Sequence, residues 1–87
     1  VSQNTALINL HCYSNLLTNI DVSNNPNLMQ LRCYDNEITS LDLSLNTALT
    51  GLFCYNNSLI SLDVKNGNNT SLTFFNAENN TLRLAVL

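Results

Sequence analysis

A regular step of twenty-one residues runs through the chain and limits the folds that it can adopt. The step is clearest in the three cysteines, Cys12, Cys33 and Cys54. Leucines, valines and asparagines keep the same step, so that one copy reads L-x-x-L-x-C-x-x-N-x-L-x-x-L-x-V-x-x-N. A period of roughly 20–50 residues is typical of arrays in which each unit stacks on the next and contributes to one continuous core.

The repeat covers nearly the whole chain, but its last copy is shifted. Five apolar or asparagine positions fall two places later than the regular step predicts, which indicates a two-residue insertion near residues 66–69: Leu72, Phe75, Ala77, Asn80 and Leu82. The first residues align with the second half of a copy. We therefore expect residues 1–87 to be one segment of about four copies from a longer chain, with open apolar ends at Val1 and Leu87 that could associate end to end.

Each copy contains two stretches in which apolar and polar residues alternate. In the first copy these are Leu10-His11-Cys12-Tyr13 and Ile20-Asp21-Val22-Ser23. Alternation is the period of a half-buried strand, and no stretch keeps the 3.6-residue period of a helix. The Asn, Ser and Thr residues between the stretches favour turns. The sequence thus predicts a repeat solenoid with a parallel β-sheet on one face, short extended segments on the other, and little or no α-helix.

The pattern L-x-x-L-x-C-x-x-N-x-L resembles the conserved half of leucine-rich repeats. The short copy, with a second L-x-V-x-x-N nested in it, is most similar to the short bacterial repeats sometimes called the IRREKO class, which are distantly similar to internalins. This resemblance implies a leucine-rich-repeat fold and a secreted or cell-surface protein with a binding or adhesive role. The fourth copy departs from the pattern, because Ala77 stands where the others have Cys.

Composition argues against several classes of partner. Only 10% of the residues are charged, and the net charge is −3, so a nucleic acid or an anionic membrane would be repelled. No apolar run reaches the ~18 residues of a membrane span. Three cysteines cannot all pair with one another, which argues against a disulfide framework. We expect no cofactor.

Because the copies are in register, each position of the repeat predicts a column of like residues along the stack. The cysteine column lies two residues after an inward leucine on the same strand, so we expect Cys12, Cys33 and Cys54 to be buried, unreactive thiols. A corner after the strand should expose backbone groups that a side-chain amide can satisfy. We assign that role to a ladder of asparagines: Asn15, Asn36, Asn57 and Asn80.

The outward residues of the first strand in each copy are the candidate binding face. All three tyrosines of the chain fall in one column, beside an arginine, a histidine and two phenylalanines. Exposed aromatic residues and arginine are enriched in binding hot spots, and stacked rings also suit sugar faces or an extended peptide. The alternative is that the tyrosines only stabilise the sheet. The candidate residues are His11, Tyr13, Arg32, Tyr34, Phe53, Tyr55 and Phe74.

A second column contains Asp21, Asp42 and Asp63, on the outward side of the second extended segment. Calcium, which binds oxygen ligands, is a weak hypothesis for this column. Hydrogen bonds from each Asp to nearby backbone or hydroxyl groups are the alternative. We expect no enzyme activity, because the register gives His11 only Arg32 and Phe53 as column neighbours.

Together these features predict an extracellular or cell-surface binding module. Its ligand would be a protein or a glycan, recognised through the exposed face of the repeat sheet. A passive structural or adhesive spacer with no specific ligand is the alternative.

Overall fold

The computed structural model describes residues 3–65 and 72–86 of the chain, and these residues form strands and no helix. Seven strands make two sheets, and every strand pair is parallel. The prediction of parallel sheet with little or no helix is therefore confirmed for this part of the chain. In the same residues there is no helix of the length and apolarity that crossing a membrane requires.

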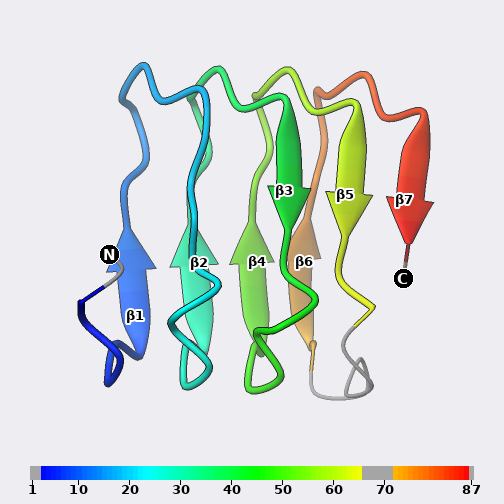
Figure 1. Cartoon of the computed structure of the whole chain (residues 1–87). Coiled ribbons are helices and arrows are strands. Elements are labelled where there is room, and N and C mark those ends of the chain that lie inside the picture. Colours follow the sequence, from blue (N-terminus) through cyan, green and yellow to red (C-terminus); the bar gives the residue numbers. More distant parts are fainter. Residues whose placement is uncertain (1–2, 66–71, 87) are drawn as a thin grey trace.

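From β2 onward the chain passes alternately between the two sheets, which lie as facing layers with their strands running in opposite directions (Figure 1). The four-stranded sheet has the order β1-β2-β4-β6, with strands Asn9–His11, Gln30–Arg32, Gly51–Phe53 and Phe74–Asn76. The three-stranded sheet has the order β3-β5-β7, with strands Ser40–Asp42, Ser61–Asp63 and Leu84–Val86.

The register of both sheets follows the sequence repeat. Leu10 of β1 pairs with Leu31 of β2, and Leu31 pairs with Leu52 of β4, so that each residue meets its counterpart in the next copy. Leu52 then pairs with Phe75 of β6. The step into β6 is thus the longer one that the fourth copy predicts. The insertion itself, near residues 66–69, and the chain ends at Val1 and Leu87 lie outside the described residues.

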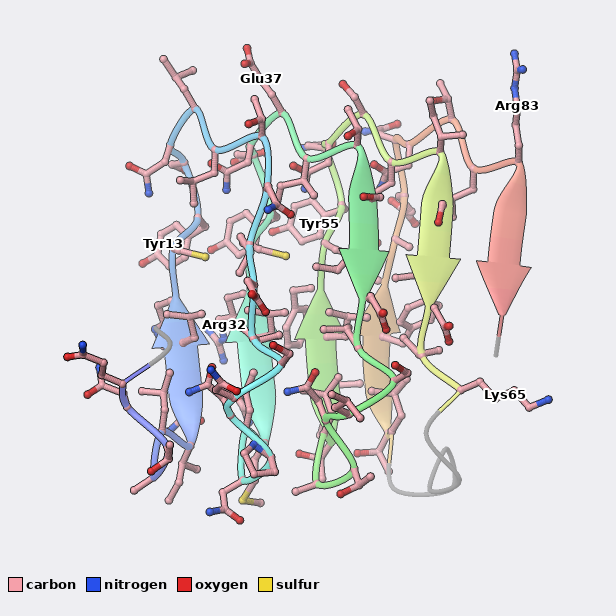
Figure 2. The ribbon with its side chains drawn as sticks, viewed as in Figure 1. Tyr13, Arg32, Glu37, Tyr55, Lys65 and Arg83 are labelled. Carbon is pink, nitrogen blue, oxygen red and sulfur yellow. The ribbon has the colours of Figure 1, made fainter. Side chains whose placement is uncertain are left out.

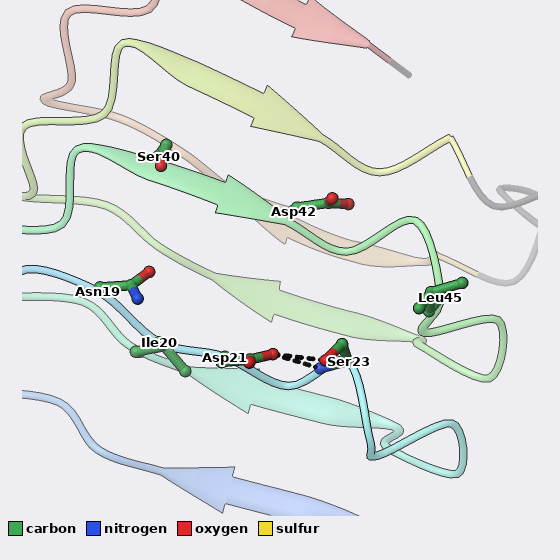
Figure 3. A pocket seen from close by; sticks show the side chains of 7 residues that line it. All are labelled: Asn19, Ile20, Asp21, Ser23, Ser40, Asp42 and Leu45. Atoms are coloured by element: carbon green, nitrogen blue, oxygen red, sulfur yellow. Dashed lines mark hydrogen bonds between the residues drawn. The ribbon is translucent and has the colours of Figure 1, made fainter. Parts of the chain in front are cut away.

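One predicted strand is wrong. Residues 20–23 alternate as expected, with Val22 buried and Asp21 exposed, but no ladder joins them to β3. A hollow of about 240 Å³ lies between this segment and β3, lined by side chains from both (Figure 3). Asn19, a residue type depleted in strands, stands where Ser40 and Ser61 begin β3 and β5.

The core lies between the two sheets and is fully formed only in the middle copies. Leu31 and Leu52 of the four-stranded sheet and Leu62 of the other are at most 1% exposed. The corresponding Leu10 in the first copy is only partly buried, and Phe75 in β6 is 45% exposed. A unit in such a stack buries its apolar face against its neighbours, so a residue with a copy on each side is covered best.

The asparagine column satisfies the backbone groups of the corner after each strand of the four-stranded sheet. The amide nitrogen of Asn36 donates to the carbonyls of Cys33 and Tyr34 in its own copy, at 3.0 and 3.2 Å, and to that of Cys12 in the preceding copy, at 3.1 Å. Its amide oxygen accepts from the N–H of Leu17 at 3.1 Å. One buried side chain thus joins two copies.

A second ladder acts at the opposite corner, where Asn25 and Asn46 are fully buried. Asn25 donates to the carbonyl of Asn4 at 2.7 Å, and Asn46 donates to those of Val22 and Asn25 at 3.0 Å. Both corners of the repeat are therefore closed by asparagine amides that reach into the preceding copy.

Replacing Asn36 with Ala should lower the free energy of unfolding by ~1–3 kcal/mol, because buried carbonyls and an N–H lose their partner. Asn15 is the matched control, since it is exposed and bonds only to carbonyls of its own copy, those of Cys12 and Tyr13. Asn15→Ala should cost clearly less. Thermal unfolding followed by circular dichroism measures both, and equal midpoints for the two variants would contradict the assignment.

Candidate functional site

The candidate residues lie along the outward side of the four-stranded sheet and just beyond the ends of its strands. His11, Arg32 and Phe53 are direct neighbours on β1, β2 and β4. Phe74 begins β6 beside Gly51 and is 62% exposed, and no ring contact joins it to another described aromatic residue. The structure thus brings the candidate residues onto one surface, with Phe74 apart from the other rings.

The tyrosine column is a continuous stack of rings. The ring centroids of Tyr13 and Tyr34 are 4.7 Å apart at an interplanar angle of 4°, and those of Tyr34 and Tyr55 are 4.5 Å apart at 7°. These separations match the ~4.8 Å between neighbouring strands, so the ladder itself sets the stacking distance. Figure 2 labels two members of the column, Tyr13 and Tyr55, just beyond the ends of the strands of this sheet.

Stacking leaves little of the ring faces open to a ligand. Tyr34 has a tyrosine on each face, so only its edge and hydroxyl are accessible, and it is half-buried. Tyr13 is the most open of the three, at 42% exposed, and its ring lies 6.2 Å from that of His11. A sugar that stacks on an aromatic residue needs a free face. The column is therefore better suited to edge and hydroxyl contacts.

A polar ladder that the sequence analysis missed runs beside the tyrosines. Ser14, Asp35, Asn56 and Asn79 all have φ between 54° and 57°, a left-handed conformation that Asn and Asp tolerate. Asn56 donates to the Asp35 carboxylate and Asn79 to the Asn56 amide oxygen, each at 2.7 Å. The signal was present in the sequence, because a Ser, Asp or Asn precedes every asparagine of the corner column.

Arg32 is held in place at the centre of the face. Its guanidinium carbon lies 5.3 Å from the centroid of the Phe53 ring, within the range of a cation–π contact. One terminal nitrogen donates to the side-chain oxygen of Gln30 at 3.3 Å, a long hydrogen bond. The Nε–H is buried and has no acceptor. Among the described side chains, no carboxylate is paired with this guanidinium.

Gly51 lies next to this arrangement. A Cβ built on Gly51 would lie 3.4 Å from the Phe53 ring and 3.5 Å from the Gln30 side chain. The outward position of β4 carries no side chain here, and Gly51 is buried with the Phe53 and Gln30 side chains close to its backbone. The sequence showed that Gly51 faces outward but gave no sign that its neighbours would bury it.

The aspartates of the second column accept hydrogen bonds from residues that follow them in the chain. Asp21 accepts hydrogen bonds from the hydroxyl and N–H of Ser23, at 2.6 and 3.0 Å, and these hold the pKa of Asp21 below its usual range. Asp42 makes the same pair with Ser44, with the same effect on its pKa, and Asp63 accepts from the N–H of Lys65. No group of three His, Cys, Asp or Glu in the described chain could hold a metal ion. The calcium hypothesis gains no support.

The cysteine column faces the core. Cys33 and Cys54 are fully buried, Cys12 is partly buried, and all three are free thiols. Burial raises the pKa of each, that of Cys54 to about 12. Since the thiolate is the reactive form and the metal ligand, these residues are poorly suited to either role at neutral pH.

Tyr34 should be sensitive to alkaline pH. Burial within the stack, followed by the charges that Tyr55 and Tyr13 acquire on ionising, raises the pKa of Tyr34. The pKa of Tyr34 is thus higher in the folded protein than in the unfolded chain. Its contribution to the stability of the fold is complete below the ordinary tyrosine pKa of ~10, and it is lost as the pH rises through the higher pKa of the folded protein. Tyrosinate absorbance of the parent should therefore include a late-ionising phenol that is missing in Tyr34→Phe. The prediction would be contradicted if the two titration curves, each divided by its number of tyrosines, were identical at high pH.

Alkylation should distinguish the cysteines. Under native conditions we expect iodoacetamide to modify Cys12 first, and Cys33 and Cys54 only when the protein unfolds, because both are buried with raised pKa values. Mass spectrometry of the digested protein gives the order, and a sample in denaturant should label all three. Labelling of Cys54 in the folded protein as fast as Cys12 would show that the core opens.

The chain matches no family model, no curated protein and no solved structure. The resemblance to leucine-rich repeats therefore rests on the residues of the repeat alone. The function of the outward face has to be argued from its own geometry.

Proposed function

We propose that the chain is part of a leucine-rich-repeat solenoid and that it acts as a binding module, at a cell surface or in the secreted space. The ligand docks on the outward side of the four-stranded sheet. The copy-to-copy register of both sheets supports the solenoid, and the resemblance in the repeat supports the location. The observation that carries the binding role is Arg32, fixed over Phe53 on an exposed face without an acidic partner.

A fixed face favours binding because little side-chain freedom is lost when the partner arrives. Tyr34 is held by stacking on both sides, and Arg32 is held by Phe53 and Gln30. A protein is favoured over a glycan as the ligand, since stacking covers both ring faces of Tyr34 and one face each of Tyr13 and Tyr55. Phe74 offers the most exposed aromatic ring of the face.

The alternative is a passive spacer, and the tyrosine stack favours it. Three rings in contact stabilise neighbouring strands by ~0.5–1.5 kcal/mol per pair without any ligand. A spacer would have no use for the exposed Phe74 or for the unpaired Arg32, and both could be lost without consequence.

A binding screen distinguishes the two functions. The parent chain and the double variant Arg32→Ser, Phe74→Ser, with folding checked by circular dichroism, are immobilised and offered protein and glycan arrays. Loss of both candidate hot-spot residues should lower the affinity for the partner at least tenfold, which corresponds to about 1.4 kcal/mol of binding free energy. Leu16→Ser is the control, because Leu16 is 80% exposed and lies at the corner beyond the face. A partner that binds parent and double variant equally, or no partner at all, would favour the spacer.

A further inference from the structure

We propose that Arg32 is a receptor for a carboxylate, and that the partner is a protein segment that presents an Asp or Glu side chain to it. This inference rests on the proposed binding function and names the chemistry of the ligand. It is carried by three observations: the position of the guanidinium, its incomplete hydrogen bonding, and the lack of an acidic side chain in direct contact with it.

The position of Arg32 is central and already fixed. It lies on β2, between His11 on β1 and Phe53 on β4. The ring of Phe53 supports one face of the guanidinium at 5.3 Å, and the ligand would bind to the terminal N–H groups, since the Nε–H is buried. A planar fork of donors matches a carboxylate, which accepts two parallel hydrogen bonds from it.

The hydrogen bonds of Arg32 within the chain are weak and incomplete. The Gln30 side chain provides a neutral acceptor at 3.3 Å, and the buried Nε–H has none. A charge-assisted bond to a carboxylate is shorter and roughly twice as strong as a neutral one. A ligand that displaces the Gln30 amide would therefore gain energy from an exchange that requires little rearrangement of the arginine.

The local positive charge of Arg32, and not the net charge of −3 of the chain, sets the sign of the group that it would bind. The chain has three Lys and Arg against six Asp and Glu, so an arginine without an acidic partner is unusual here. Asp35, close to Arg32 along the chain, accepts from Asn56 at 2.7 Å. The three aspartates of the other column accept from their own following residues. None of these acids neutralises Arg32 by a direct contact.

An acidic glycan would present the same carboxylate, but this face offers a sugar ring fewer open aromatic faces on which to stack. Both faces of Tyr34 are covered by tyrosines, and Arg32 lies over the Phe53 ring. A uronic or sialic acid on Arg32 would thus find the Tyr34 faces closed. The more exposed rings of Tyr13 and Phe74 lie after β1 and on β6, away from β2. A peptide needs only edge contacts and hydroxyls, which the tyrosine column provides.

The test uses random displayed peptides selected against the immobilised chain. Three baits are compared: the parent, Arg32→Gln, and Arg83→Gln, which removes the same charge from an exposed residue away from the four-stranded sheet (Figure 2). Parent and Arg83→Gln should both enrich peptides with a recurrent Asp or Glu, whereas Arg32→Gln should not. A fourth bait, Arg32→Glu, should enrich Lys or Arg instead.

The selected peptide then allows a thermodynamic cycle. Replacing its acidic residue with the matching amide should weaken binding to the parent about tenfold or more, and should change binding to Arg32→Gln little. Arg32→Lys keeps the charge but loses the planar fork, so it should bind with intermediate affinity. That variant keeps the test decisive if Arg32→Gln is unstable.

Each other outcome overturns the inference. Selected peptides that bind through Phe74 and not Arg32, or that carry no recurrent Asp or Glu, would support the binding function but reject the carboxylate as the group that Arg32 binds. Selection of uronic or sialic glycans on a parallel array, without acidic peptides, would replace the protein partner with a sugar. No enriched peptide or glycan on the parent would remove both the inference and the proposed function.

Discussion

Hydrogen bonding between equivalent backbone positions of successive copies is the interaction on which the rest of the structure depends. It pairs each strand with the strand one repeat later, in parallel and without slippage, in both sheets. A shift by one residue would turn every core leucine outward, so the burial of these leucines and the ladder hold the same register. The asparagine amides reinforce it at the corners, where the ladder ends.

This pairing arranges like side chains in columns ~4.8 Å apart, and the energetic result depends on the side chain. Tyrosine rings gain from the spacing, because it equals a stacking distance. Asparagine gains as well, because one amide reaches two copies. Aspartates repel one another in such a column, and here Asp21 and Asp42 each accept two hydrogen bonds from a serine two residues on, which stabilise the charged form.

On the outward face, residues that repeat from copy to copy stabilise the sheet, and residues that do not repeat are available to contact a ligand. Tyrosines that stack along the ladder make the face rigid, but they also cover the surfaces that a ligand would contact. Positions that break the column pattern are therefore the ones available for specificity. Arg32, Gly51 and Phe74 are such positions, since none of them has a like neighbour in its column. The candidate site consequently combines a regular support with a few irregular residues.

The sequence by itself determined the repeat length, the parallel pairing of strands, the absence of helix in the described chain and the inward or outward side of each position. These follow from periodicity, which records the backbone register directly. Only the tertiary structure decided the contacts between side chains of different copies. Residues 20–23 are in neither sheet although they alternate, and a hollow lies between their side chains and those of β3. Both ring faces of Tyr34 are closed, Phe53 and Gln30 lie beside the Gly51 backbone, and Arg32 has no acidic partner. Each of these depends on distances between side chains of different copies, and a pattern along one chain does not specify such distances.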